Sequence, residues 1–164
     1  MVQRAIVSLL SACLALGASS AAAQYRQDIW RNVGGFNIIG IADGRAFHRC
    51  TAIFPGQEGE VRLTQLRNRT WGISTPPVIV AGGTDPVIRL HAEGVKAFRT
   101  TTDGNRTWTV GPLPDDAVNA LRRVRGNLVV QTDNRRMVRP LGDVPLVEVM
   151  RGIERCVTDH TRNP

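Results

Sequence analysis

The chain has 164 residues, 42% of them hydrophobic, and its charged side chains give a net charge of +7 at pH 7. A chain of this length is expected to form one domain of ordinary size. The positive charge favours anionic neighbours such as phospholipid, lipopolysaccharide, nucleic acid or acidic proteins, although the basic residues are scattered along the chain.

The first residues have the pattern of a secretory signal peptide. Arg4 precedes a short apolar run, and Ala21 and Ala23 stand at the positions that signal peptidase recognises. We therefore expect residues 1–23 to be removed by cleavage before Gln24.

The rest of the chain, residues 24–164, is expected to form a single globular domain that is periplasmic or secreted. No apolar run after the cleavage site approaches the roughly 20 residues that a helix needs to cross a bilayer. One alternative stays open, because the LSAC sequence that ends at Cys13 resembles a lipobox. In that case the protein is a lipoprotein anchored through Cys13.

Short apolar or alternating runs separated by turn residues dominate the first part of the domain, which is the pattern of an antiparallel sheet. The expected strands cover residues 36–42, 47–54, 60–66, 70–75, 86–92, 94–100 and 106–112. In the second of these, alternation places His48, Cys50 and Phe54 on one face and Phe47 and Arg49 on the other.

The tetrapeptide NRTW occurs twice, at Asn68–Trp71 and at Asn105–Trp108. Each copy follows a strand-like run and places its Trp at the start of another strand. Asn tolerates a positive φ and bonds to nearby backbone, so both copies are interpreted as turns. The sequences after the two copies differ, which argues against a duplication. Both copies are also N-x-T sequons, which matter only in a eukaryotic secretory pathway.

Two helices are expected in the second half, near residues 115–125 and 144–158. Asp115 or Asp116 should cap the first, and Gly126 should end it. Two further strands, 127–133 and 137–142, lie between the helices. The predicted fold is α+β, with an antiparallel sheet of about seven to nine short strands and two helices packed on it.

Two cysteines, Cys50 and Cys156, remain after cleavage of the signal peptide. Export to an oxidising compartment makes a disulfide the expected state of this pair. Cys156 falls on the apolar stripe of the last helix, so the bridge is expected to join that helix to an early strand.

The sequence gives little sign of a catalytic or metal centre. Ser74, the only serine after the cleavage site, lacks a nucleophile-elbow motif. His48 is two residues from Cys50, but a disulfide would silence that thiol. His48, His91 and His160 are far apart, with His160 expected in a frayed tail, so we expect no metal ion and no cofactor.

Two basic clusters stand out in the second half of the chain. Nucleic-acid-binding surfaces usually combine such residues with aromatic side chains that stack on bases, and no aromatic residue follows Trp108. Solvated faces are therefore the favoured interpretation, and nucleic acid is an unlikely partner. The clusters consist of Arg122, Arg123 and Arg125, and of Arg135, Arg136 and Arg139.

The order of these features resembles a group of small exported alphaproteobacterial proteins that are distantly similar to the invasion-associated locus B proteins. The features are a signal peptide, Trp30, the F-x-x-C-x-A pattern of Phe47, Cys50 and Ala52, the W-G-I at Trp71, the Asp103-Gly104 pair, and the final segment from Leu141 to Cys156. The resemblance implies a periplasmic or secreted protein with a disulfide. It transfers no catalytic residue.

The function expected from the sequence is a binding or accessory role without catalysis, with another exported protein or an anionic envelope component as the partner. The oligomeric state is not indicated. The alternative is a small envelope-directed hydrolase that uses His48 or His91 with a nearby Asp. The expected binding surface comprises Trp71, Trp108, Arg122, Arg125, Arg135 and Arg136.

Overall fold

The computed structural model describes residues 25–76, 87–92, 95–99, 101–102, 108–132 and 135–162. Its strands form two antiparallel sheets and two helices accompany them, which confirms the predicted α+β class. In spatial order, the seven-stranded sheet contains β1 (Tyr25–Val33), β2 (Phe36–Asp43), β3 (Ala46–Phe54), β4 (Val61–Leu66), β5 (Trp71–Thr75), β9 (Trp108–Val110) and β8 (Thr101–Thr102). The four-stranded sheet contains β11 (Arg136–Pro140), β10 (Asn127–Gln131), β6 (Val87–His91) and β7 (Val95–Arg99).

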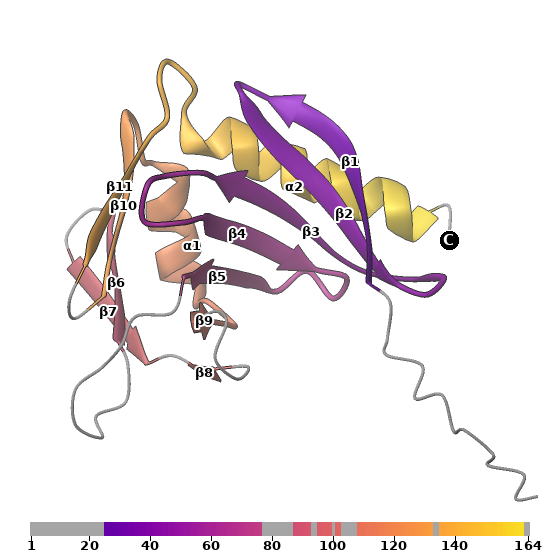
Figure 1. Ribbon diagram of the computed structural model, residues 1–164, viewed down its shortest axis with the longest axis horizontal. Helices are drawn as coiled ribbons and strands as arrows, with labels where there is room; N and C mark the ends of the chain where they lie inside the picture. Colours follow the sequence, from indigo (N-terminus) through magenta and orange to yellow (C-terminus); the bar gives the residue numbers. More distant parts are fainter. Residues whose placement is uncertain are drawn as a thin grey trace, which may run out of the picture.

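The helices α1 (Asp115–Arg122) and α2 (Leu146–Arg162) lie on the same side of the seven-stranded sheet (Figure 1). α2 crosses β1 to β4 and also contacts α1, while the four-stranded sheet stands at one end of the molecule. The last helix therefore covers one face of the larger sheet. Neither of the two described helices packs on the opposite face, which is called the uncovered face below. Of the helices that lie in the described ranges, neither is long and apolar enough to span a membrane.

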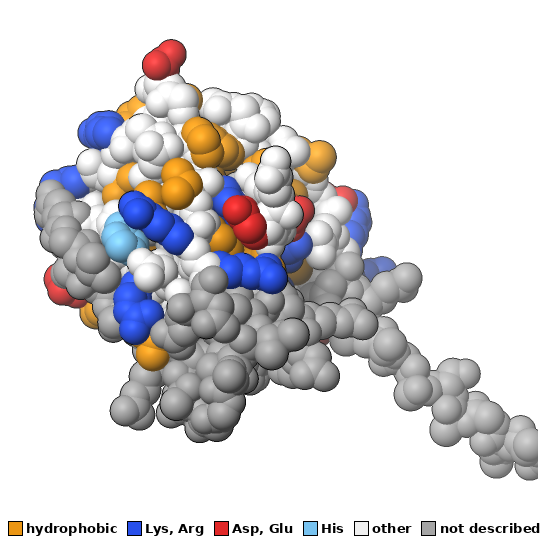
Figure 2. Space-filling model, turned by 60° about the vertical axis from the view of Figure 1, so that its left-hand side comes forward, with side chains coloured by type: hydrophobic (Ala, Val, Ile, Leu, Met, Phe, Trp, Pro, Cys, Tyr) orange, Lys and Arg blue, Asp and Glu red, His pale blue; other side chains and the backbone are white. Residues whose placement is uncertain are grey.

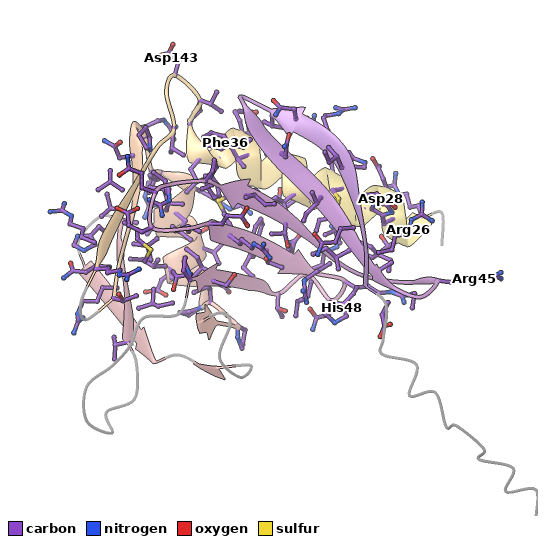
Figure 3. All side chains as sticks on the ribbon, in the orientation of Figure 1. Arg26, Asp28, Phe36, Arg45, His48 and Asp143 are labelled. Carbon is purple, nitrogen blue, oxygen red and sulfur yellow. A yellow bond between two sulfur atoms is a disulfide. The ribbon has the colours of Figure 1, made fainter. Side chains whose placement is uncertain are left out.

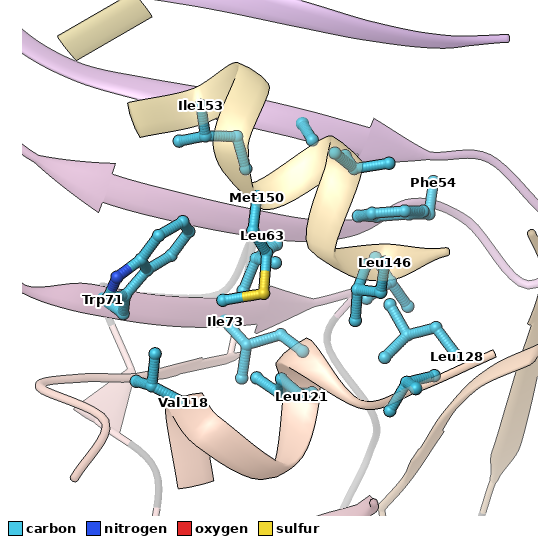
Figure 4. Packing of buried hydrophobic residues seen from close by; sticks show 14 of the residues in the cluster. Phe54, Leu63, Trp71, Ile73, Val118, Leu121, Leu128, Leu146, Met150 and Ile153 are labelled. Atoms are coloured by element: carbon cyan, nitrogen blue, oxygen red, sulfur yellow. The ribbon is translucent and has the colours of Figure 1, made fainter. Parts of the chain in front are cut away.

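The core lies between α2, α1 and the covered face of the larger sheet (Figure 4). Met150 of α2 is fully buried and lies close to Leu63, Trp71 and Ile73 of the sheet. Burying one such side chain contributes about 1.5–3 kcal/mol, so this stripe dominates the attachment of the helix. The buried residues of α2 recur at helical spacing, as predicted: Leu146, Val149, Met150, Gly152, Ile153, Cys156 and Val157.

The ends of α1 differ from the prediction. Pro114, and not Asp115 or Asp116, occupies the N-cap position, and no side chain caps the helix. Asp116 instead accepts a hydrogen bond at 2.8 Å from the backbone N–H of Ala117, and both acids lie in the first turn, where the helix dipole favours them. The helix ends at Arg122, before the expected Gly126.

A β-bulge in β3 changes the predicted alternation. Ile41 pairs with Arg49 and Ala42 pairs with Phe47, so His48 is the extra residue. One additional residue inverts the side-chain alternation beyond it. Phe47 therefore joins Cys50 on the face covered by α2, which corrects its predicted position on the other face.

The first NRTW copy is the turn between β4 and β5. The Asn68 side-chain oxygen accepts hydrogen bonds from the Thr70 backbone N–H at 3.1 Å and from the Thr70 hydroxyl at 2.7 Å. The positive φ, 70°, belongs to Arg69 and not to Asn68. Arg69 also donates to the Thr158 hydroxyl at 3.0 Å, so the turn is tied to α2. In the second copy, Trp108 begins β9 and residues 105–107 lie outside the described residues.

The strand β1 forms one edge of the larger sheet and was not predicted. It pairs with β2 through the backbone, and most of its described side chains are exposed, including Ile29 at 68%. Arg26 and Asp28 form an exposed ion pair at 2.8 Å near its start (Figure 3). Because little of this strand is buried, its sequence lacks the alternation that identifies strands.

Arg139 links the four-stranded sheet to the loop between β3 and β4. Its side chain is 3% exposed, and it donates to the Glu58 carboxylate at 3.0 Å and to the Gly59 carbonyl at 2.8 Å. The pKa of Glu58 is lowered below its ordinary value of 4.5. The largest cause is a backbone hydrogen bond to its carboxylate, and the second is the hydrogen bond from Arg139. Arg139, expected on a solvated face, is thus a buried structural residue.

Replacing Glu58 with Gln should destabilise the protein at neutral pH more than in acid. The pKa of Glu58 is lower in the folded state than in the unfolded state, so its contribution is present above 4.5 and is lost as the pH falls through the folded pKa. Urea unfolding of both proteins at pH 7 and at about pH 3 tests this. Glu148→Gln, which removes an exposed acid on α2, controls for the change in net charge. An equal loss of stability in Glu58→Gln at both pH values would contradict the lowered pKa of Glu58.

Candidate functional site

The uncovered face of the larger sheet carries a group of polar side chains that the strand register brings together. Thr51 lies opposite Thr64, and Thr64 lies opposite Gly72, so the three residues form one row across β3, β4 and β5. The Thr51 and Thr64 hydroxyl oxygens are 2.9 Å apart and share a hydrogen bond. Gly72 has no side chain, so the surface is lower at the end of this row.

Two arginines flank the row on the same face. Arg49 lies opposite Leu66 on one side, and Arg62 lies opposite Ser74 on the other. Arg62 donates to the Glu60 carboxylate from Nε at 3.0 Å and from Nη2 at 2.6 Å. Arg49 Nη1 lies 3.3 Å from His48 Nδ1. Both guanidinium groups are therefore held at the rim of the face by neighbours in the sequence.

These residues line a cavity of about 430 Å³. Its described lining contains two arginines and neither Asp nor Glu, although Glu60 outside the lining is paired with Arg62. Threonine, serine and asparagine side chains offer hydrogen-bonding groups beside apolar surface. The described lining residues are Ile41, Arg49, Thr51, Arg62, Thr64, Leu66, Asn68, Thr70, Trp71, Gly72, Ile73, Ser74, Gly111 and Pro112.

The two tryptophans of the expected binding surface have different settings. Trp71 is 7% exposed and packs in the core against Met150, while it also contributes to the edge of the cavity. The side chain of Trp108 lies outside the described residues, although its backbone in β9 pairs with Thr75.

Two arginines of the expected binding surface, Arg122 and Arg125, form hydrogen bonds within the protein. Arg122 donates to the Glu154 carboxylate at 2.5 Å and so joins α1 to α2. Arg125 donates to the carbonyl oxygens of Arg122 and Val124 at the end of α1, and the Val124 carbonyl also accepts a bond at 3.2 Å from the Leu146 backbone N–H.

The remaining two, Arg135 and Arg136, are exposed at the start of β11. Arg136 lies opposite Gln131, on the face of the smaller sheet directed away from the core. The molecule seen from the side of this sheet shows Arg, His and hydrophobic side chains side by side (Figure 2). This face is separate from the cavity on the larger sheet.

The histidines proposed for hydrolysis have neutral or basic partners. His48 lies in the bulge of β3 (Figure 3), and its Nδ1 atom is 3.3 Å from Arg49 Nη1. His91 Nε2 lies 2.9 Å from the Gln131 side-chain oxygen. Among the residues that the structure describes, neither histidine forms a hydrogen bond or ion pair with a carboxylate. The pairing of His with Asp that the hydrolase requires is thus not observed at these two positions.

The predicted disulfide is present. Cys50 and Cys156 are bonded, with their Cα atoms 6.1 Å apart, and both residues are fully buried. The bond joins β3 to α2, as the sequence predicted, and closes a separation of 106 residues.

Sequence reasoning missed His160. It does not lie in a frayed tail but in α2, four residues after Cys156, where its ring stacks on Phe47 with centroids 4.9 Å apart. A ring nitrogen of His160 and the two disulfide sulfur atoms all lie within 4.8 Å of one another. The available signal was the C-x-x-x-H spacing, which places two side chains on one face of a helix.

Comparisons with known proteins add no family assignment. No protein-family model, no curated protein and no solved structure matches this chain. The resemblance to locus B proteins stays a prediction.

Proposed function

We propose that this protein is an exported, non-catalytic binding domain whose ligand occupies the cavity on the uncovered face of the larger sheet. The observation that carries the proposal is the cavity itself, a space of about 430 Å³ with hydrogen-bonding groups at its floor and two arginines at its rim. Ligand sites are typically concave, largely apolar and provided with a few well-placed polar groups.

The ligand class follows from the charge and shape of the cavity. A carboxylate or phosphate in the cavity would bond to Arg49 and compete with Glu60 for Arg62, because guanidinium groups donate paired hydrogen bonds to these anions. Leu66 and Pro112 supply apolar surface beside them. An amphipathic anion of the cell envelope combines both properties. The hydrolase alternative has no comparable support in the histidine geometry.

Export is supported by two features of the chain. Residues 1–23 have the pattern of a signal peptide, and the buried Cys50–Cys156 disulfide suits an oxidising compartment. The protein isolated from its cell of origin should therefore begin at Gln24, as N-terminal sequencing or intact mass would show. A diacylglyceryl-modified Cys13 at the N-terminus would instead indicate an anchored lipoprotein.

A fluorescent fatty acid tests the binding site directly. A dansylated fatty acid should show saturable binding, and its uncharged methyl ester should bind more weakly, because only the acid offers a carboxylate to the arginines. The variant with Arg49→Gln and Arg62→Gln should bind the acid about tenfold more weakly or worse, since a charge-assisted hydrogen bond contributes about 1.5–3 kcal/mol.

Arg151→Gln is the matched control, because Arg151 is an exposed arginine on α2 and does not line the cavity. It should bind the acid as the unmodified protein does. Equal binding of acid and ester, equal weakening by Arg151→Gln, or no saturable binding would each contradict the proposal.

A further inference from the structure

The disulfide lies beside the imidazole of His160, a polar ring that is partly buried. The Nε2 atom of His160 is buried and has no hydrogen-bond partner among the residues that the structure describes. A buried polar atom without a partner costs free energy, so such a group in a native structure calls for an explanation.

The position of the His160 ring is fixed from two sides. Phe47 stacks on it, with an angle of 12° between the ring planes, and this contact exists because the bulge at His48 directs Phe47 toward α2. On the other side lies Gly40 of β2, where an added Cβ would approach His160 Nε2 to 2.6 Å. The missing side chain of Gly40 is what leaves room for the imidazole.

The fixed ring is close to both sulfur atoms. Cys156 and His160 are four residues apart on α2, so they project from the same face of the helix, and Cys50 comes from β3. All three potential ligand atoms lie within 4.8 Å of one another. Two thiolates and one imidazole form a ligand set that suits Zn²⁺, with a fourth position left for water.

We propose that the reduced Cys50–Cys156 pair and His160 form a Zn²⁺ site, so that the disulfide and the metal ion are alternative cross-links between β3 and α2. In the disulfide, each sulfur is bonded to the other and no thiolate is available. A dithiol reductant transfers two electrons and two protons to the S–S bond, giving two thiols and the oxidised reductant. Zn²⁺ then displaces the two thiol protons to solvent and binds both sulfurs and a ring nitrogen.

The geometry requires only a local adjustment. Zn–S bonds of about 2.3 Å in a tetrahedral site place two sulfur atoms roughly 3.8 Å apart. Breaking the S–S bond allows this separation by rotation of the two side chains, because the Cα atoms are already 6.1 Å apart. The inference does not depend on the ligand proposed for the cavity, since the two sites lie on opposite faces of the larger sheet.

Titration of the reduced protein with Co²⁺, a spectroscopic substitute for Zn²⁺, tests the proposal. After reduction with dithiothreitol and anaerobic removal of the reductant, the protein should bind one Co²⁺ per chain. The spectrum should show thiolate-to-cobalt charge transfer and the intense visible bands of tetrahedral Co²⁺, and Zn²⁺ should displace the signal. The oxidised protein should show none of these features.

His160→Phe keeps an aromatic ring against Phe47 and removes the third ligand. We expect its affinity for Co²⁺ to fall at least about tenfold, because losing even a hydrogen-bond partner of a metal ligand lowers the affinity for the metal by about this factor. His91→Phe, a change at a half-buried histidine in the smaller sheet, should leave the affinity unchanged. Equal affinity of His160→Phe and the unmodified protein, binding by the oxidised protein, or no binding by the reduced protein would overturn the proposal.

Reduction itself can unfold the chain, so circular dichroism accompanies the titration. If the reduced protein is unfolded, Zn²⁺ should restore the native spectrum in the unmodified protein and not in His160→Phe. Failure of Zn²⁺ to restore it, or equal restoration in both proteins, would also overturn the proposal.

Discussion

Replacement of both Cys50 and Cys156 by alanine should lower the free energy of unfolding by about 2–5 kcal/mol. The disulfide closes a separation of 106 residues, so it restricts the unfolded chain strongly, and the chain-entropy model assigns nearly 5 kcal/mol to a loop of this size. Both residues are fully buried, so their loss also removes packing between β3 and α2. Urea unfolding of the variant and of the oxidised protein measures the difference.

The reduced protein, kept in dithiothreitol and a metal chelator, separates the two contributions. It retains both sulfur atoms in the core but lacks the covalent bond, so its stability isolates the effect of the cross-link. We expect most of the loss to appear already in this form. An unchanged unfolding midpoint in the double variant, or reactive thiols in the denatured, non-reduced protein that begins at Gln24, would contradict the presence of a stabilising bridge.

The parts of the fold that the sequence predicts are those whose side chains are buried on one face. β4 alternates strictly between buried and half-buried residues, and the apolar stripe of α2 recurs at helical spacing. The disulfide itself was predicted from two cysteines in an exported chain, and the position of Cys156 on that stripe predicted which helix it joins. In each case, local periodicity reflects a single buried face and needs no knowledge of the partner.

The parts that the sequence does not predict depend on pairing between distant segments. β1 is held by its backbone bonds to β2 and buries little, so its side chains carry no strand pattern. The smaller sheet exists because β10 pairs with β6, a contact that alternation alone does not specify. The single-residue bulge at His48 likewise follows from the register of β2 against β3.

The candidate site shows the same limit. Arg49, Thr51, Arg62 and Thr64 look like ordinary exposed positions of two strands, and only the register places them around one cavity. Three of the six arginines that stand out in the sequence, Arg122, Arg125 and Arg139, serve as structural links. Arginine clusters in the sequence therefore indicate this candidate site less well than polar residues that alternate with buried residues along a strand.

Ile38→Ala should lower the free energy of unfolding by about 2–5 kcal/mol, the usual cost of truncating a fully buried isoleucine. Ile38 is 0% exposed on β2 and lies under α2, where Gly152 allows close approach of the helix. Ile29→Ala on the neighbouring strand β1 is a matched control, because the same change is made at a residue that is 68% exposed. It should alter stability by no more than about 0.5 kcal/mol, as measured by urea unfolding.

A second substitution tests whether Ile38 and Gly152 meet as the structure shows. A Cβ at Gly152 would collide with Ile38 Cδ1 and approach Val33 Cγ2 to 3.0 Å. Gly152→Ala alone should therefore destabilise by about 1–3 kcal/mol, despite the roughly 1 kcal/mol by which alanine favours a helix over glycine. In the Ile38→Ala background the collision is absent, so Gly152→Ala should be neutral or stabilising. Additive effects of the two changes would show that the helix does not contact β2 at this point.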